Sequence, residues 1–393
     1  MVAQDAILRY IFMVKPLIRI EHVVKIIHIY KDYFPVLGGI ENHIRVLAEA
    51  QAAAGHAVTV LVCARARRTT EEQLNGVRVI RAARLATVAS MPLSLTQPWL
   101  LARAEADIAH LHSPYPLGET ANWLWGRARA TVITHHSDVV RQRLLLRFHG
   151  PILRRVLRAA DAIIVTSPRY LETSPWLQPV REHCTVVPLG IDLTRFPVRE
   201  RRPLAGPPML LFVGRLRYYK GLDTLLYALG ALPEVRLTVV GDGPMRASWQ
   251  RLARELGIAE RVDFVGEVDE AMLPTYYARA DLFVLPANAR AEAFGTVLLE
   301  AMATGLPVVS TEVGTGTSWV NQDGVTGRVT PPRDPTALAA AIGELLAAPE
   351  KLAAMGRAAR ARVEAEFTLP TMVARVQAVY ERALAAQRRA NVR

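Results

Sequence analysis

The residues best suited to hold a polyanion are two cations that follow one predicted strand. Arg215 and Lys220 come directly after the apolar run 209–214. The chain contains 48 Lys and Arg residues, but its lysines are only Lys15, Lys25, Lys31, Lys220 and Lys351. Because an ammonium is a compact point charge and a guanidinium is a broad planar fork, a crowded anion pocket can use one of each. Chance placement is the alternative; we interpret Lys220 as a diphosphate ligand.

Two carboxylates eight residues apart form a second group. Glu292 precedes a turn at Phe294–Gly295, and Glu300 lies about one turn into the helix predicted to follow. The backbone N–H groups at the start of that helix lack helical partners and favour an anion or a hydroxyl oxygen. The alternative is a simple helix cap and a solvated carboxylate. We expect Glu292 to take part in the chemistry.

Two glycines mark a possible third site. Gly38 and Gly39 follow the first predicted strand, and a helix is expected to start near Glu41. Glycine lets the backbone approach a ligand closely, and a helix N-terminus attracts anions. An ordinary turn is an equally good interpretation of this pair taken alone.

The elements that must position these residues form two series of alternating strands and helices. Buried strands are predicted over 23–30, 57–64, 130–136 and 162–167, and again over 209–214, 236–241, 262–266, 282–286 and 307–311. This alternation predicts two doubly wound α/β domains, with ligands beyond the carboxyl ends of the strands. We predict domains over 1–195 and 206–370 joined by a linker within 185–208, and a helix over 371–393 that returns to the first domain. Residues 1–22 are interpreted as a flexible extension, and a membrane-surface segment over 7–20 is the alternative.

Charge and composition limit the classes of partner that the protein is expected to bind. The net charge is +12, of which +9 falls in residues 1–190 (23 basic, 14 acidic) and +3 in residues 191–393 (25 basic, 22 acidic). A basic first half suggests an anionic partner, such as nucleic acid, a membrane surface or a phosphorylated substrate. Two cysteines give neither a disulfide framework nor a metal-ligand spacing and fit a reducing compartment. No run of 18 apolar residues predicts a membrane span.

The ordered motifs resemble those of glycosyltransferase family 4, a retaining family with the GT-B fold of two Rossmann-like domains facing a central cleft. The resemblance covers residues 23–385. It rests on GGIENHIRVLAEAQAAAGHAVTVL, TVVPLGIDLTRF, VGRLRYYKGLDTLLYAL, VVGDGP, VDFVGEV, ARADLFVLP and the E-x7-E signature EAFGTVLLEAMATGLPVV. Asn288 and Thr296 depart from the residues usual in the family at their positions.

The resemblance implies a role for each matching residue. Gly38 and Gly39 would lie against the donor diphosphate, which Arg215 and Lys220 would neutralise. Glu292 would approach the sugar hydroxyls beside the N–H groups of Phe294, Gly295 and Thr296. Glu300 would bind the ribose, and Gly266 and Val268 would contact the base. His136 would lie near the sugar; because His135 and His136 alternate on a strand, only one of them is expected to be functional.

The resemblance also implies a substrate pair. THHSDVVRQRLLLRFHGPILRRVLRAAD resembles bacterial exopolysaccharide and O-antigen mannosyltransferases, which implies transfer of mannose from GDP-mannose to a polyprenyl-diphosphate-linked oligosaccharide. UDP-sugar donors are the alternative. No D-x-D pair occurs, so we expect no metal at the diphosphate and no cofactor. Arg154, Arg155 and Arg158, after a new helix start expected at Pro151, are a candidate contact with anionic lipid. An ordinary packed helix with a solvated arginine face is an equally good interpretation.

The expected location is therefore cytoplasmic and peripheral on the inner face of the membrane. A nucleic-acid-binding protein is the rival suggested by charge, but no basic tail or known module is present. A sugar-nucleotide epimerase of the same fold is the second rival. We expect no nucleic-acid partner.

Overall fold

The computed structural model describes residues 22–36, 38–88, 91–138, 143–198 and 206–392. Residues 1–21 of the predicted extension over residues 1–22 lie outside the described residues. The chain divides into two compact units. Unit 1 comprises Met1–Thr166, Ser174–Pro188 and Pro370–Arg393, and unit 2 comprises Ser167–Thr173 and Leu189–Leu369.

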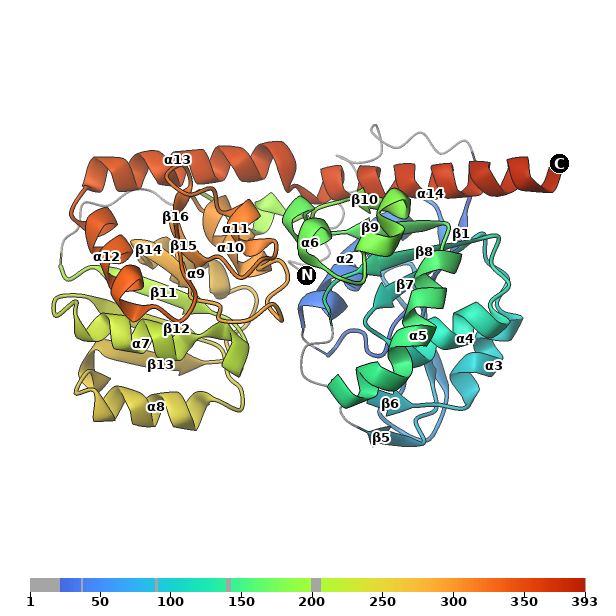
Figure 1. The fold of residues 1–393 in the computed structure, drawn as a ribbon, viewed down its shortest axis with the longest axis horizontal. Helices are drawn as coiled ribbons and strands as arrows, with labels where there is room; N and C mark the ends of the chain where they lie inside the picture. The colour runs from blue at the N-terminus through green and yellow to red at the C-terminus, as the bar shows by residue number, and fades with distance from the viewer. Residues whose placement is uncertain (1–21, 37, 89–90, 139–142, 199–205, 393) are drawn as a thin grey trace. The chain divides into compact units, whose positions relative to one another are not determined.

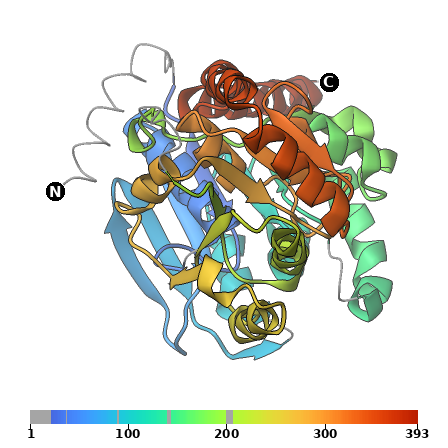
Figure 2. The same ribbon diagram turned by 90° about the vertical axis from the view of Figure 1, so that its left-hand side faces the viewer.

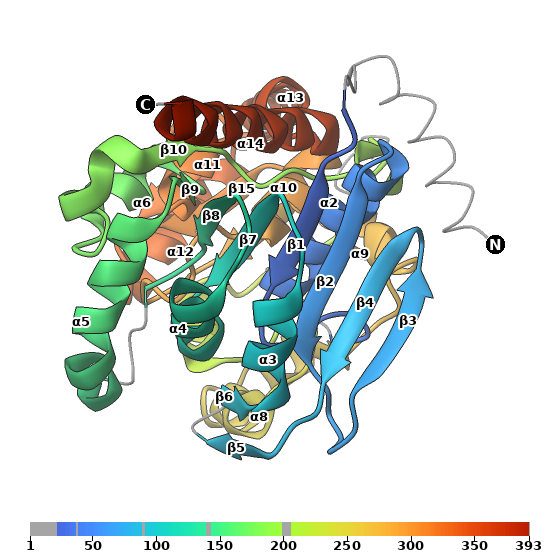
Figure 3. The ribbon, with the colours of Figure 1, turned by 90° about the vertical axis from the view of Figure 1, so that its right-hand side faces the viewer.

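Unit 1 is built on an eight-stranded sheet in the order β10-β9-β8-β7-β1-β2-β4-β3, parallel except for β3 (Figures 1 and 3). Its strands are β1 (Lys25–Ile29), β2 (Ala57–Cys63), β3 (Thr70–Leu74), β4 (Val77–Ala82), β7 (Ile108–Ser113), β8 (Ala130–His135), β9 (Ala162–Val165) and β10 (Cys184–Val186). A small antiparallel hairpin joins β5 (Ala86–Val88) to β6 (Met91–Leu93). The predicted runs of unit 1 correspond to β1, β2, β8 and β9.

Strand β7 was missing from the prediction although it lies beside β1 in the middle of the sheet. Its sequence, IAHLHS, carries two histidines and so does not form a continuous apolar run. All six of its residues are nevertheless buried. The side chains of His110 and His112 therefore project from a central strand into the protein interior.

The helices of unit 1 are α2 (Gly39–Ala53), α3 (Thr96–Arg103), α4 (Pro116–Trp125), α5 (Arg143–Ala159) and α14 (Leu369–Val392). Helix α14 belongs to unit 1, and its Tyr380 hydroxyl lies 2.6 Å from Nδ1 of His110. The expected helix start at Pro151 is wrong, because α5 continues through this proline. Pro151 cannot donate to the carbonyl of Arg147 one turn earlier, and both residues are exposed.

Unit 2 contains an entirely parallel six-stranded sheet in the order β13-β12-β11-β14-β15-β16 (Figure 2). Its strands are β11 (Met209–Val213), β12 (Arg236–Val240), β13 (Val262–Gly266), β14 (Leu282–Leu285), β15 (Val308–Thr311) and β16 (Gly327–Thr330). All five predicted strands are present, and β16 is additional.

Helices cover both faces of this sheet. They are α7 (Leu222–Gly230), α8 (Arg246–Glu255), α9 (Leu273–Arg279), α10 (Thr296–Ala303), α11 (Thr317–Val320), α12 (Pro335–Leu346) and α13 (Pro349–Glu366). The short helix α6 (Pro168–Thr173) also belongs to unit 2. Alternate residues of β11 lie on opposite faces of the sheet. Leu210 and Phe212 pack with α7, α8 and α12 on one face, and Leu211 and Val213 pack with α9 and α10 on the other. Burial of both faces explains why the strands of this unit are short continuous apolar runs.

Candidate active site

Lys220 lies in a tight loop that follows β11 in unit 2. A Cβ atom on Gly214 would lie 3.3 Å from both Cε and Nζ of Lys220, so the lysine packs across this glycine. Lys220 ends a short 3₁₀ turn, η3 (Tyr218–Lys220), and Gly221 continues the chain with φ +68°. A Cβ on Gly221 would lie 2.0 Å from the carbonyl oxygen of Pro286. The glycines therefore let the loop press against the end of β14.

Lys220 and Glu292 form a buried ion pair. Nζ of Lys220 lies 2.6 Å from Oε2 of Glu292, and the two side chains are only 11% and 9% exposed. Burial opposes the charge on Lys220, but the Glu292 carboxylate, together with Tyr219 and Glu300, outweighs it and raises the pKa of the ammonium. The two residues that the sequence placed on the diphosphate and on the sugar thus contact each other directly.

The loops that carry this pair are fixed by hydrogen bonds to the backbone. Asn288, which follows β14, donates from its backbone N–H to Tyr219 and from Nδ2 to the carbonyl of Tyr218, both over 3.0 Å. The hydroxyl of Thr315 donates to the carbonyl of Glu292 over 2.7 Å. In the sequence, Asn288 stands out only as a departure from the family pattern; in the structure it positions the Lys220 turn.

Glu300 lies on α10 and is also paired. Its Oε2 accepts a hydrogen bond from the hydroxyl of Tyr277 over 2.7 Å. Burial raises the pKa of the Glu300 carboxyl, and the opposing effects of Tyr277, Arg195 and Lys220 do not cancel it. Tyr277, on α9, was not predicted, because a tyrosine in a helical stretch carries no signal of its partner.

The backbone turn before α10 has the form that the sequence predicted. Gly295 precedes the helix with φ +79°, a left-handed conformation that favours glycine, and Phe294 is buried in the core of unit 2. The first N–H groups of α10, from Thr296 onward, lack intrahelical acceptors by the geometry of a helix. They follow Glu292 in the chain, so this turn offers both a carboxylate and hydrogen-bond donors.

The remaining predicted residues of unit 2 lie at neighbouring strand ends. Arg215 is exposed just after β11. Gly266 ends β13 with φ +93°, and its carbonyl accepts from the N–H of Gly241 over 2.7 Å. Val268 is partly buried against the core. Since β11, β13 and β14 are parallel, all these residues and the ion pair follow carboxyl ends of strands in one sheet.

Gly38 and Gly39 begin α2 in unit 1 and are exposed. A Cβ on Gly38 would lie 2.1 Å from Oε2 of Glu41, so the Glu41 carboxylate lies directly against this glycine. The space beside Gly39 is open, with no atom within 4 Å of a Cβ placed there. Gly39 is thus the more accessible of the two for a ligand.

His135 and His136, at the end of β8 in unit 1, are both buried. His135 lies 3.1 Å from Oδ1 of Asp138 through its Nε2. His136 lies 3.0 Å from Nδ1 of His112 through its Nε2, and burial together with His43 and His135 holds its pKa well below its usual range. His136 is therefore a neutral imidazole in a group of histidines that the sequence did not predict.

This geometry suits the binding of an anion with attached hydroxyl groups. A buried ammonium, an exposed guanidinium, two carboxylates and a helix N-terminus follow the strands of unit 2. Such groups can neutralise a diphosphate and accept hydrogen bonds from sugar hydroxyls.

Two family models match the chain. "Glycosyltransferase Family 4" matches residues 37–195, and "Glycosyl transferases group 1" matches residues 197–362. D-rhamnosyltransferase WbpZ of Pseudomonas aeruginosa is 36% identical over 88% of this chain and 92% of its own length. O-antigen chain mannosyltransferase C of Escherichia coli is 34% identical over 89% of this chain and 96% of its own.

Solved structures agree in fold. Sucrose-phosphate synthase from Thermosynechococcus elongatus superimposes with a TM-score of 0.78 and 26% identity, covering 92% of this chain and 99% of that protein. HepE of Anabaena with UDP-glucose gives a TM-score of 0.73 at 21% identity, covering 91% and 98%. The chain therefore belongs to glycosyltransferase family 4 and is a glycosyltransferase with the GT-B fold.

Proposed function

We propose that this enzyme transfers mannose from GDP-mannose, with retention of configuration, to a polyprenyl-diphosphate-linked oligosaccharide in bacterial polysaccharide synthesis. The observation that carries the transfer chemistry is the buried ion pair of Lys220 and Glu292 beyond the strands of unit 2. The choice of mannose is supported by two relatives, named O-antigen chain mannosyltransferase C and, over 56% of this chain, GDP-mannose-dependent alpha-(1-6)-phosphatidylinositol monomannoside mannosyltransferase.

The ion pair suggests how donor binding and chemistry are linked. Before the donor binds, Glu292 neutralises the Lys220 ammonium. A diphosphate then adds a second anion on the lysine, and Arg215 contributes from the exposed side. Negative charge grows on the leaving diphosphate as the anomeric bond breaks, so cations fixed in advance stabilise the transition state more than the bound substrate.

The other predicted site residues bind separate parts of the donor. Glu292 and the N–H groups of Phe294, Gly295 and Thr296 bind the sugar hydroxyls. Glu300 accepts from the ribose, and Gly266 and Val268 contact the base through their backbones. In unit 1, Gly38 and Gly39 bind the diphosphate and His136 lies near the sugar as a neutral hydrogen-bonding group.

No residue in the sequence is recognisable as a covalent nucleophile. The proposal is front-face attack through an oxocarbenium-like state, in which a phosphate oxygen of the leaving group helps to deprotonate the acceptor hydroxyl. Because cations of the protein neutralise the diphosphate, the reaction proceeds without Mg²⁺ or Mn²⁺. The test is transfer in buffer treated with a chelator, compared with the same buffer after either metal is restored.

The acceptor implies that the enzyme works at the cytoplasmic face of the membrane. Among the residues described, no helix is long and apolar enough to cross a bilayer. Helices α3, α4 and α5 pack side by side in unit 1 (Figure 3). They carry exposed aromatic and basic side chains: Trp99, Trp123, Trp125, Arg154, Arg155 and Arg158. Tryptophan and arginine together suit the interface of an anionic membrane.

A UDP-sugar donor is the second candidate, because a relative with 31% identity over 93% of the chain is named glycogen synthase. A sugar-nucleotide epimerase is less favoured. The test incubates the enzyme with labelled GDP-mannose, or with a UDP-hexose, and a polyprenyl-diphosphate-linked saccharide. Mannose transfer from GDP-mannose supports the proposal. Transfer from the UDP-hexose alone supports the second candidate, and conversion of the free nucleotide sugar without an acceptor supports the epimerase.

A further inference from the structure

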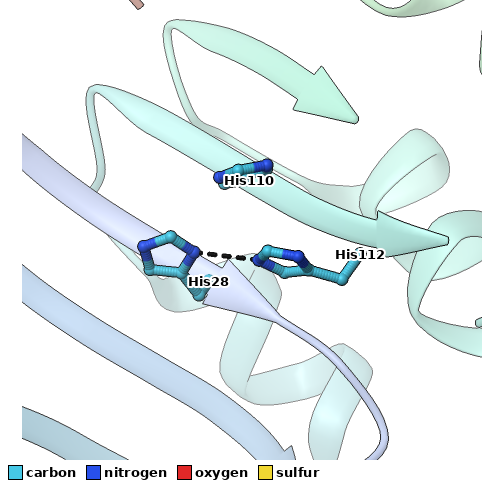
Figure 4. A group of neighbouring side chains, drawn as sticks. All are labelled: His28, His110 and His112. Atoms are coloured by element: carbon cyan, nitrogen blue, oxygen red, sulfur yellow. Dashed lines mark hydrogen bonds between the residues drawn. The ribbon is translucent and has the colours of Figure 1, made fainter. Parts of the chain in front are cut away.

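All ten histidines of the chain lie between His22 and His183, and five of them gather in the interior of unit 1. They come from β1, α2, β7 and the end of β8: His28, His43, His110, His112 and His136. Figure 4 shows three of them on the adjacent strands β1 and β7. The pKa of each is lowered by burial, so their ring nitrogens are available as neutral ligands.

A chain of hydrogen bonds determines which nitrogens carry protons. Oε1 of Gln51 lies 2.7 Å from Nε2 of His28, and Nε2 of Gln51 donates to Tyr380 over 3.2 Å. His28 must therefore donate from Nε2, which leaves its Nδ1 as an acceptor. Nε2 of His112 lies 3.0 Å from that Nδ1 and must donate to it (Figure 4). The lone pair of His112 is consequently on Nδ1, which points toward His136.

Among the residues that the structure describes, two groups of three histidines have ring nitrogens within 4.8 Å of one another: His28, His110 and His112; and His43, His112 and His136. The first group is a poor metal site. Nδ1 of His110 lies 2.6 Å from the Tyr380 hydroxyl, and its Nε2 lies 2.6 Å from the Thr134 hydroxyl. Both of its nitrogens are therefore occupied, and all three rings are completely buried.

The second group differs in two respects. Nε2 of His43 is buried without a hydrogen-bond partner in the described structure, although such nitrogens normally have one. His43 and His136 are also slightly exposed, at 7% and 5%, whereas all three rings of the first group are fully buried. One ring nitrogen from each of His43, His112 and His136 lies within 4.8 Å of the other two. Both ring nitrogens of His112 are hydrogen-bonded, but its Nδ1 is bonded to His136, so the bond that a metal ion would replace joins two members of the same group.

We propose that His43, His112 and His136 bind a divalent transition metal of the zinc class. Three neutral imidazoles are a known ligand set for Zn²⁺, and imidazole also suits Co²⁺ and Ni²⁺. Ligand nitrogens at about 2.05 Å from a tetrahedral ion are about 3.3 Å apart. The 3.0 Å separation of His112 Nδ1 and His136 Nε2 is close to this value. Metal binding requires the proton on Nε2 of His136 to move to Nδ1.

The surrounding residues form the outer shell that such a site needs. His112 donates its second N–H to His28, which is held by Gln51, and Gln51 contacts Tyr380 of α14. Outer hydrogen bonds of this kind fix the ring orientation and tautomer of a metal ligand. All three ligands belong to unit 1, and one of them, His136, is also the residue that the proposed function places near the sugar.

The test uses untagged full-length protein, stripped with a chelator and titrated with Co²⁺ and then Zn²⁺. The wild type should bind one equivalent of Co²⁺ with the intense visible absorption of a four-coordinate ion, and Zn²⁺ should displace it. His43→Gln should weaken binding at least tenfold. His56→Gln is the matched control, because His56 is equally buried and also has an unpartnered Nε2 but lies outside the group; it should bind like the wild type.

A second measurement separates metal binding from folding. Zn²⁺ should raise the unfolding temperature of the wild type and of His56→Gln, but not that of His43→Gln, because only ligand bound to the native state adds stability. His43 is at the edge of the group, so His43→Gln is expected to fold. Absence of stoichiometric Co²⁺ binding by folded wild type, or equal binding by His43→Gln, would overturn the proposal and leave a hydrogen-bonded histidine chain.

Discussion

At the residue scale, the structure explains why position 220 holds a lysine in a chain whose basic residues are mostly arginine. The side chain passes across Gly214 and ends against Glu292 in a space with little exposure. A compact ammonium on an unbranched stem suits this space better than a broad planar guanidinium. The sequence supported the choice of Lys220, Glu292 and Glu300 as functional residues. It could not show that Lys220 and Glu292 form an ion pair, because 72 residues separate them.

Replacement of Lys220 should therefore affect the diphosphate rather than the nucleoside. We expect Lys220→Ala to weaken binding of GDP at least tenfold, because the buried point charge is lost, while guanosine binding is unchanged. Lys220→Arg should also be impaired, because the guanidinium is too broad for the space beside Gly214. Isothermal titration calorimetry with GDP and guanosine checks both variants. An equal loss for guanosine would show that Lys220 supports folding instead.

At the element scale, turns and strands differ in how far the sequence predicts them. The strand–turn–helix arrangement around Gly295 was predicted because an apolar run, the carboxylate Glu292 and the glycine follow one another in the sequence. Strand β7 was not predicted, because its two histidines interrupt the apolar pattern of the strand. The same histidines come together only when β1, β7, β8 and α2 pack, so no local spacing could reveal a ligand group.

The tight turn at Gly221 gives an element-scale prediction. Gly221→Ala should destabilise unit 2 by about 2 kcal/mol or more, because a left-handed φ costs a non-glycine residue about 1–2 kcal/mol and the methyl group would meet Pro286. GDP affinity should fall as the Lys220 loop moves. Gly230→Ala, at the end of α7, is the control, since no atom lies within 4 Å of its Cβ. Urea unfolding of both variants is the measurement; equal midpoints would contradict the packing argument.

The buried histidines predict how unit 1 responds to acid. Burial lowers the pKa of His28 from 6.5 to about 4 and that of His43 to about 3. Since the unfolded chain binds protons at higher pH than the native one, stability is lost as pH falls from about 6.5 toward 4. His28 alone accounts for up to about 3 kcal/mol at about 1.4 kcal/mol per pKa unit.

Hydrogen exchange measured by mass spectrometry at pH 7 and pH 5, corrected for intrinsic rates, checks this prediction. Peptides from β1 and β7 should lose protection at pH 5 in the metal-free protein. Peptides from β11 and β12 serve as the internal control, because unit 2 contains no histidine. Loss of protection to the same extent in both units would contradict the role of the histidines.

At the scale of the whole molecule, the sequence predicted two Rossmann-like domains correctly because each alternates short apolar strands with helices. The basic excess of the first half is a whole-molecule property as well. In the structure, Arg154, Arg155 and Arg158 are exposed on α5, opposite the buried Leu153 and Val156. One face of α5 therefore packs in the interior of unit 1, and the opposite face is a cationic surface.

Membrane binding should follow this surface. We expect the protein to bind anionic vesicles, and binding should fall steeply with salt, because attraction is screened within about 10 Å at 0.1 M. Arg154→Gln, Arg155→Gln and Arg158→Gln together should reduce vesicle co-sedimentation without changing GDP affinity. A triple Gln variant at Arg251, Arg254 and Arg357, which are exposed in unit 2, is the charge-matched control. Equal vesicle binding by the two triple variants would exclude α5 as the contact.

The central claim is that the Lys220–Glu292 pair carries the transfer of the sugar. The most direct measurement compares the wild type with Glu292→Gln in single-turnover transfer from GDP-mannose to the lipid-linked acceptor, with the anomeric configuration of the product read by NMR. We predict an α-mannoside from the wild type, at least a hundredfold slower transfer by Glu292→Gln, and GDP affinity of the variant within a few fold of normal. Near-normal transfer by Glu292→Gln with intact nucleotide binding would contradict the account.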